Sequence, residues 1–140
     1  MKMISISGID KSGKTTILNA LNEATNYQHF VIERDPATVM FFAKLLGRPI
    51  DTMEYEKLMY HYRSMPFLSV LLTCDNEDLE NRFAEHNEPA LPGPLSIADH
   101  QSGIIEAFIK ANWRFPLIHN TSFWSVKETV AAIIERLEDI

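Results

Sequence analysis

The sequence has few cysteines, few basic residues and no long apolar run, and each shortage excludes a class of protein. Cys74 is the only cysteine in 140 residues, so an internal disulfide is impossible; a single cysteine is compatible with a reducing cytosol but does not indicate the compartment. Acidic residues outnumber basic ones by 19 to 13, and the net charge of −6 argues against general affinity for nucleic acid or an anionic membrane. No apolar stretch approaches the length of a membrane span, and the first residues turn polar too soon for a signal peptide. We therefore expect a soluble, cytoplasmic protein.

The composition is typical of one globular domain. Hydrophobic residues make up 46% and charged residues 23% of the chain, and its length suffices for a single core of ordinary size. No repeat, low-complexity tract or linker divides the sequence. We expect one domain that spans residues 1–140.

Short apolar runs typical of strands alternate with patterns typical of helices. The expected strands are residues 3–7, 30–32, 67–73 and 115–119. The expected helices are residues 14–21, 39–46, 54–62, 76–83, 97–112 and 126–137. Pro36 favours a loop before the second helix, and three of the seven prolines make residues 86–96 a loop. This alternation indicates a three-layer α/β fold with a parallel sheet of four or five strands, whose following loops lie along one edge.

Residues 8–15 form a complete phosphate-binding motif. Their sequence, Gly-Ile-Asp-Lys-Ser-Gly-Lys-Thr, matches G-x-x-x-x-G-K-[ST] at every fixed position, between an expected strand and an expected helix. Gly8 and Gly13 allow the backbone N–H groups to turn toward an anion, and the start of the helix adds partial positive charge. Lys14 should reach the β- and γ-phosphates, and the Thr15 hydroxyl should ligate Mg²⁺. The alternative, a glycine turn that matches by chance, is disfavoured by the flanking elements.

Other motifs narrow the class of phosphate-binding protein. No Asp-x-x-Gly switch of the small GTPases follows the phosphate-binding motif, and their Asn-Lys-x-Asp motif is absent from the sequence. Residues 70–75 imitate the acidic strand end of a motor ATPase, but 140 residues leave little room for a coupling apparatus. Small kinases of nucleosides and nucleotides fit the length best.

The phosphate-binding motif and the residue after it resemble the corresponding loop of thymidylate kinases. That family has an acidic residue at the position of Asp10, and its loop carboxylate contacts the sugar of the bound nucleotide. Its members carry a catalytic basic residue either in this loop or in a lid. Here Lys11 lies in the loop, and residues 83–99 contain no Arg or Lys, as in the loop-basic type. Lys11 would then stabilise the charge that develops on the transferred phosphoryl group, the alternative being a solvated loop lysine.

The resemblance implies a P-loop kinase fold, ATP and Mg²⁺ as cofactors, and a lid at residues 84–98. Because thymidylate kinases are commonly dimers, it also implies a homodimer. It implies that the ATP phosphates are bound by Gly8, Asp10, Lys11, Ser12, Gly13, Lys14, Thr15 and Thr16.

The binding site for the phosphate acceptor is less well defined, because two alignments with known kinases are possible. Arg34-Asp35-Pro36 resembles the Arg-Glu-Pro that follows the second strand of thymidylate kinases, and residues 58–63 resemble their arginine-bearing helix. In the second alignment, Glu33-Arg34 imitates the Glu/Asp-Arg motif of deoxynucleoside kinases. Both alignments place Arg34 at a strand end beside the phosphates, and both leave out one substrate element of the family.

The resemblance gives each acceptor-side residue an expected role. Arg34 and Arg63 would clamp the acceptor phosphate, since a guanidinium matches phosphate oxygens bidentately. Phe42 and Tyr62 would stack on the base, although aromatic residues at helical spacing are more often core. Asp10 would contact the acceptor, and Arg82 would contact adenine or phosphate. Asp35 or Glu33 would join the Mg²⁺ shell or polarise an acceptor hydroxyl.

These residues lead to one functional hypothesis and two alternatives. We expect an ATP- and Mg²⁺-dependent kinase of a (deoxy)nucleoside monophosphate, with dTMP as the leading acceptor and Lys14, Lys11 and Arg34 as catalytic residues. A deoxynucleoside kinase is the first alternative. A truncated homologue that binds nucleotide and regulates a partner is the second.

Overall fold

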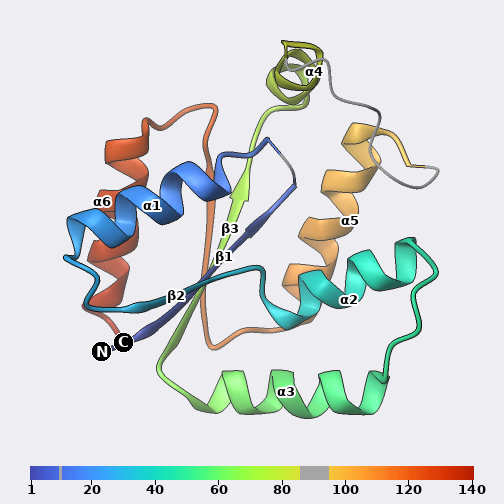
Figure 1. Cartoon of the computed structure of the whole chain (residues 1–140), viewed down its shortest axis with the longest axis horizontal. Helices are drawn as coiled ribbons and strands as arrows, with labels where there is room; N and C mark the ends of the chain where they lie inside the picture. Colours follow the sequence, from blue (N-terminus) through green and yellow to red (C-terminus); the bar gives the residue numbers. More distant parts are fainter. Residues whose placement is uncertain (10, 86–94) are drawn as a thin grey trace.

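The computed structural model describes residues 1–9, 11–85 and 95–140, and Figure 1 shows its course. Strands and helices alternate as expected, and the described residues form one parallel sheet with strand order β2-β1-β3-β4. In chain order the elements are β1 (Met3–Gly8), α1 (Lys14–Ala24), β2 (Phe30–Glu33), α2 (Pro36–Leu45), α3 (Thr52–Ser64), β3 (Phe67–Thr73), α4 (Asn76–Glu85), α5 (Ile97–Lys110), β4 (Phe115–Asn120) and α6 (Val126–Leu137). The prediction of a parallel α/β fold is confirmed.

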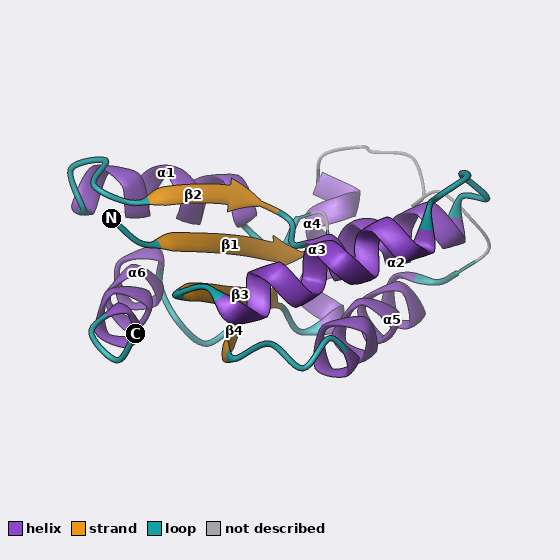
Figure 2. Ribbon diagram, turned by 90° about the horizontal axis from the view of Figure 1, so that it is seen from below, coloured by secondary structure: helices purple, strands orange, loops and turns teal. Residues whose placement is uncertain are grey.

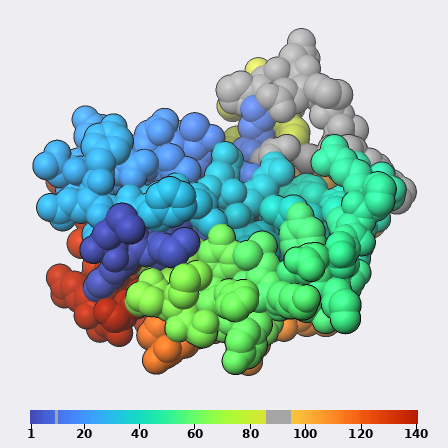
Figure 3. Space-filling model, turned by 60° about the horizontal axis from the view of Figure 1, so that its bottom comes forward, coloured from blue at the N-terminus to red at the C-terminus, as the bar shows by residue number. Residues whose placement is uncertain are grey.

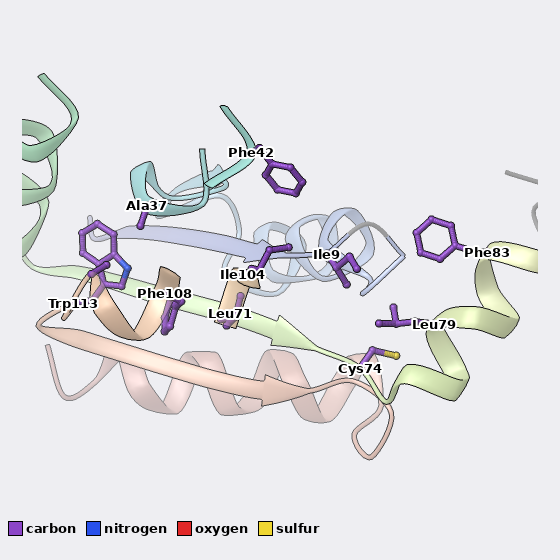
Figure 4. Packing of buried hydrophobic residues seen from close by; sticks show 11 residues of the cluster. Ile9, Ala37, Phe42, Leu71, Cys74, Leu79, Phe83, Ile104, Phe108 and Trp113 are labelled. Carbon is purple, nitrogen blue, oxygen red and sulfur yellow. The ribbon is translucent and has the colours of Figure 1, made fainter. Parts of the chain in front are cut away.

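Helices cover both faces of this sheet, which gives the expected three layers (Figure 2). Side chains alternate between the faces of a strand, so Leu68, Val70 and Leu72 of β3 point to one side and Leu71 to the other. The first set packs with α1 and α6 in one apolar cluster. Leu71 packs with residues of α2, α4 and α5 in a second cluster, which Figure 4 shows from close by. Both faces of the central strands are therefore buried, as parallel sheets require.

The carboxyl ends of the strands meet at one edge of the sheet. Gly8, the last residue of β1, is paired with Leu72 near the end of β3, and Thr73 is paired with Asn120 at the end of β4. The loops that follow β1, β2, β3 and β4 therefore gather at this edge, where parallel α/β folds bind ligands. No helix in the described ranges is long and apolar enough to cross a membrane.

The beginning of α2 differs from the sequence prediction. Pro36 was expected in a loop, but it is the first residue of the helix, and Asp35 caps it by accepting a hydrogen bond from the Thr38 backbone N–H. Proline is well suited to this first position because its fixed φ is helical and its missing N–H would have no helical partner there. The expected lid, residues 84–98, overlaps the end of α4 and the start of α5, and its central residues 86–94 lie outside the described residues.

Candidate functional site

The phosphate loop follows β1, and its backbone has conformations that glycine adopts more easily than other residues. Gly8 has φ of 153°, and an added Cβ would lie 2.5 Å from the Leu72 carbonyl oxygen. Lys11 and Gly13 have φ of 68° and 96°, both in the left-handed region. The loop then closes on itself, with the Ser12 N–H donating to the Ile9 carbonyl at 3.1 Å. The described part of the loop therefore forms a tight turn between strand and helix.

The start of α1 can receive an anion. Its cap, Gly13, offers no side chain to the first N–H groups, and the first turn holds no acidic residue. The Thr15 and Thr16 side chains are exposed, whereas Lys14 is buried and its Nζ donates to the Gly8 carbonyl at 3.0 Å. The buried Ser12 hydroxyl has no hydrogen-bond partner among the described residues. Uncapped N–H groups at a helix start together with a lysine fit a phosphate chain.

Two neighbouring elements hold the loop by its carbonyl groups. Arg82 of α4 donates from Nη1 to the Lys11 carbonyl at 2.7 Å. Thr121, directly after β4, donates from Oγ1 to the Ser12 carbonyl at 2.9 Å. Its backbone N–H donates to the Thr73 carbonyl at 2.8 Å, which fixes Thr121 to the end of β3. The conformation of the loop is thus set by contacts from far along the chain as well as by its own glycines.

Arg34 lies where both alignments expected it, directly after β2. Its backbone N–H donates to the Ile6 carbonyl of β1 at 2.9 Å, and its φ is 70°. The guanidinium carbon lies 4.7 Å from the ring centroid of Phe42, a cation–π distance. β2 is the only described strand on this side of β1, so Arg34 follows the strand that neighbours the one leading into the phosphate loop.

Asp35 does not occupy the place of a magnesium ligand. It is fully buried, and its carboxylate accepts hydrogen bonds from the Ser7 hydroxyl at 2.8 Å and the Thr38 backbone N–H at 2.9 Å. Its own backbone N–H donates to Ser7 Oγ at 2.9 Å. Burial raises the pKa of the Asp35 carboxyl, although the bonds from Thr38 and Ser7 act in the opposite direction. Asp35 instead ties Ser7, near the end of β1, to the start of α2, and its expected metal role is corrected.

The structure does not bring Arg63 and Tyr62 to the phosphate loop. The Tyr62 ring packs against Phe67, the first residue of β3, with centroids 4.6 Å apart. Arg63 donates from Nε to the Ala111 carbonyl at 2.7 Å. Because α3 leads directly into β3, its last turn lies at the amino end of that strand. The loop follows the carboxyl ends, five residues or about 17 Å further along β3.

Phe42, also expected at the acceptor, is buried, but it lies on the loop side of α2. Figure 4 shows it toward Ile9, whereas Ala37 of the same helix lies toward Trp113. Its ring centroid is 5.3 Å from that of His100 on α5, a buried residue that sequence reasoning missed. The Phe42 ring therefore lies next to both Arg34 and His100. The histidine gave no sequence signal because its neighbours come from another helix.

A cavity of about 190 Å³ lies on the other side of the loop. It is lined by Gly13 and Thr16 of the loop and α1, by Arg82, by Thr121 and by Trp124. Trp124 is half exposed, and its ring centroid lies 5.7 Å from that of His119. Burial lowers the pKa of the His119 imidazole, with Glu128 acting in the opposite direction. A planar base could lie between the Arg82 guanidinium and the Trp124 indole, which line the same cavity. The sequence pattern did not indicate Trp124 as part of the site.

The remaining predicted residue of the site, Asp10, lies outside the described residues, as does the central part of the lid. Among the described residues, no group of three His, Cys, Asp or Glu side chains could hold a metal ion. The exposed Thr15 hydroxyl keeps its expected position at the start of α1.

The sequence matches no protein-family model and no curated protein. Solved structures share its fold. The YorR protein of Bacillus subtilis, solved in complex with phosphorylated GDP, superposes with a TM-score of 0.75 and 17% identity, over 98% of this chain and 96% of that chain. Thymidylate kinase from Candida albicans superposes with a TM-score of 0.63 and 12% identity, over 99% of this chain and 91% of that chain. The chain has a P-loop kinase fold.

The P-loop kinase fold explains why the described site residues gather where they do. Lys14 begins the helix after β1, Arg34 follows β2, Arg82 lies in the helix after β3, and Thr121 follows β4. At these identities the likeness establishes the architecture, and the chemistry has to be argued from the side chains.

Proposed function

We propose that this chain is a nucleotide kinase that transfers the γ-phosphoryl group of ATP to a (deoxy)nucleoside monophosphate, with dTMP as the leading acceptor. The observation that carries the proposal is the phosphate loop, with its uncapped helix start and the buried Lys14 beside Gly8. A loop of this kind binds the phosphates of a nucleoside triphosphate.

Each residue near the loop would have a distinct task. The N–H groups at the start of α1 and the Lys14 ammonium would hold the donor phosphates, and Lys11 would stabilise the charge that develops on the transferred group. Arg34 would orient the acceptor phosphate from the end of β2, and Asp10 would contact the sugar, as the family resemblance implies. Arg82 and Trp124 would receive the donor base. Mg²⁺, when bound, offsets phosphate charge, and the Thr15 hydroxyl would contribute to its shell.

The identity of the acceptor has two alternatives. A guanine nucleotide is favoured by the YorR protein, whose structure was solved with phosphorylated GDP. A free nucleoside is supported by the contacts of Arg63 and Tyr62 near the amino end of β3, because an acceptor at the loop would then have Arg34 alone of the two expected arginine clamps.

A coupled ADP- or GDP-release assay tests the proposal. ATP and GTP serve as donors, with dTMP, dCMP, dGMP, GMP and the free nucleosides as acceptors. We expect turnover with monophosphates that falls roughly 100-fold in Lys14→Ala and is unchanged in Lys57→Ala, which alters an exposed lysine of α3.

Three outcomes would contradict the proposal. Turnover that survives Lys14→Ala would show that the activity does not come from this loop. Turnover with nucleosides alone would identify a nucleoside kinase. Tight ATP binding without acceptor-dependent turnover would favour the nucleotide-binding regulator.

We also propose that the chain forms a homodimer, as the resemblance to thymidylate kinases implies. Light scattering after size-exclusion chromatography would give about twice the 16.0 kDa chain mass. A mass of one chain at micromolar concentration would overturn this part of the proposal.

A further inference from the structure

Gln101 of α5 holds both backbone groups of Cys74, the residue that directly follows β3. Its Oε1 accepts from the Cys74 N–H at 3.0 Å, and its Nε2 donates to the Cys74 carbonyl at 2.8 Å. Gln101 is buried among the elements that make this contact. Because a side-chain amide carries the same donor and acceptor as a peptide group, Gln101 pairs with Cys74 as a neighbouring strand would. The end of β3 is therefore fixed by a helix 27 residues away in the chain.

The amide of Gln101 also contacts the start of α4. Its Nε2 donates to Asn76 Oδ1 at 3.1 Å, and Asn76 is the first residue of that helix. Only one orientation of the amide satisfies its contacts with Cys74, because a backbone N–H can only donate and a carbonyl oxygen can only accept. An apolar residue at position 101 would leave both backbone groups of Cys74 without these bonds.

Residues 74–76, which we call the β3–α4 joint, are held from a second side by the loop after β4. The Asp75 N–H donates to Ser122 Oγ at 2.8 Å, and Cys74 Sγ lies 3.2 Å from the same oxygen. The Asp75 carbonyl accepts from the Leu79 N–H at 3.0 Å, which begins the hydrogen bonding of α4. The contacts of the joint therefore set the direction in which α4 leaves the sheet.

α4 in turn contacts the phosphate loop at two points. Arg82 donates from Nη1 to the Lys11 carbonyl at 2.7 Å. Leu79 and Phe83 pack in the same apolar cluster as Ile9, and Figure 4 shows them on the side of α4 that is turned toward Ile9. In the space-filling view of Figure 3, yellow atoms of α4 lie beside blue atoms of the phosphate loop at the top of the molecule.

The direction of α4 determines whether Arg82 meets the loop. Arg82 lies six positions after Asn76, a rise of about 9 Å along the helix. A tilt of about 10° at the joint would move the Arg82 backbone by about 1.5 Å. A hydrogen bond does not tolerate a change of this size, so the contact with the Lys11 carbonyl would be lost.

We propose that Gln101 is a positioning residue for the phosphate loop. It fixes the β3–α4 joint, α4 then places Arg82, and Arg82 holds the Lys11 carbonyl. Because Arg82 also lines the cavity beside the loop, Gln101 affects nucleotide binding as well as the placement of Lys11. The effect on phosphoryl transfer rests on the proposed function, whereas the effect on nucleotide binding needs no acceptor.

A double-mutant cycle between positions 101 and 82 tests the proposal. Its proteins are the wild type, Gln101→Met, Arg82→Ala and the double variant, since methionine keeps the length of glutamine without the amide. We expect Gln101→Met to lower kcat at saturating nucleotide, and to weaken MgATP binding in calorimetry, each about tenfold. In the Arg82→Ala background the same change should alter both values by less than about twofold, because the residue through which Gln101 acts is gone.

Cys74 reports on the joint without any nucleotide, because it is the only cysteine and only 2% of its surface is exposed. The rate at which N-ethylmaleimide labels Cys74 in the folded protein should rise at least about tenfold in Gln101→Met, since the joint opens more often. Gln28→Met, the same change at an exposed glutamine, is the matched control. It should leave kcat, the MgATP affinity and the labelling rate within about twofold.

Three results would overturn the proposal. An equal loss of kcat and affinity on Gln101→Met in both backgrounds would indicate a role in stability alone, and wild-type values in Gln101→Met would indicate no role. Unchanged labelling of Cys74 would show that Gln101 does not hold the joint. Absence of acceptor-dependent turnover in the wild type would contradict the proposed function instead, and the MgATP affinities then decide the cycle. If Gln101→Met fails to fold, Asn76→Ala takes its place, because it removes one Gln101 bond at an exposed position.

Discussion

Gly8 and Gly13 frame the same loop, but the side-chain space around them differs. A Cβ on Gly8 would meet the Leu72 carbonyl at 2.5 Å and Ser12 Oγ at 2.7 Å, whereas a Cβ on Gly13 would meet nothing within 4 Å. We expect Gly8→Ala to lower the free energy of unfolding by about 3 kcal/mol, because the paired strands must separate. Gly13→Ala should cost about 1 kcal/mol from its positive φ alone. Urea unfolding of both variants checks the order, and a larger cost at Gly13 would contradict it.

Asp35 gives the stability of the protein a specific pH dependence. Because burial raises its pKa, the folded protein keeps the proton to a higher pH than the unfolded chain does. Its favourable contribution is therefore complete below the ordinary value of 3.8 and is lost as the pH rises through the raised value. Asp35→Asn keeps an acceptor for the Thr38 N–H but cannot ionise.

The free energy of unfolding of the wild type minus that of Asp35→Asn should therefore decline with rising pH and then level off. Urea unfolding of both proteins from about pH 4 to pH 8 measures this difference. A difference that rises over this interval would show that the carboxylate, not the acid, is the form that the fold favours.

At the scale of elements, α6 begins with a reciprocal cap. Ser125 accepts from the Glu128 backbone N–H at 3.1 Å, and the Glu128 side chain accepts from the Ser125 N–H at the same distance. Ser125→Ala should cost about 1 kcal/mol of stability. Ser102→Ala, in an exposed position of α5, is the matched control and should change little. Thermal unfolding of both variants measures this difference. Equal changes in melting temperature for Ser125→Ala and Ser102→Ala would mean that the cap does not stabilise the start of α6.

The sequence predicted some elements of the site well and others poorly, for identifiable reasons. The turn between β1 and α1 was predictable because glycines, lysine and threonine at this fixed spacing are typical of a loop between a strand and a helix. Asp35-Pro36 carried a signal that was misread, since an acidic cap followed by proline is typical of a helix start. Arg63 was expected at the acceptor phosphate because residues 58–63 resemble the arginine-bearing helix of thymidylate kinases. Its position is decided by connectivity, since α3 enters β3 at the amino end.

Trp124 and His100 were missed for a different reason. Trp124 follows a strand in a short loop, where no periodicity marks an aromatic residue as core or ligand contact. His100 is buried within a helix and gains its place near Phe42 only through packing of α5 against α2. A local sequence pattern does not show which elements far apart in the chain pack against each other.

At the scale of the whole molecule, ligand binding and stability are linked. A nucleotide that binds only the folded state raises the apparent free energy of unfolding, by about 2.7 kcal/mol at a concentration 100 times its Kd. We expect Mg²⁺ with ATP to raise the melting temperature of the wild type by several degrees, and to leave Lys14→Ala nearly unchanged. An equal shift in both proteins would place the binding outside the phosphate loop.

The two chain ends lie together in Figure 1, and the Lys2 ammonium donates to the Leu137 carbonyl. Met3 begins β1, so both ends lie at the amino edge of the sheet, away from the phosphate loop. The chain can therefore be circularly permuted, with a short glycine-serine linker between its ends and new ends in the exposed turn at residues 47–49. The permuted protein should show the helical circular dichroism and the nucleotide-dependent melting shift of the parent, because neither the strand order nor the loop would change.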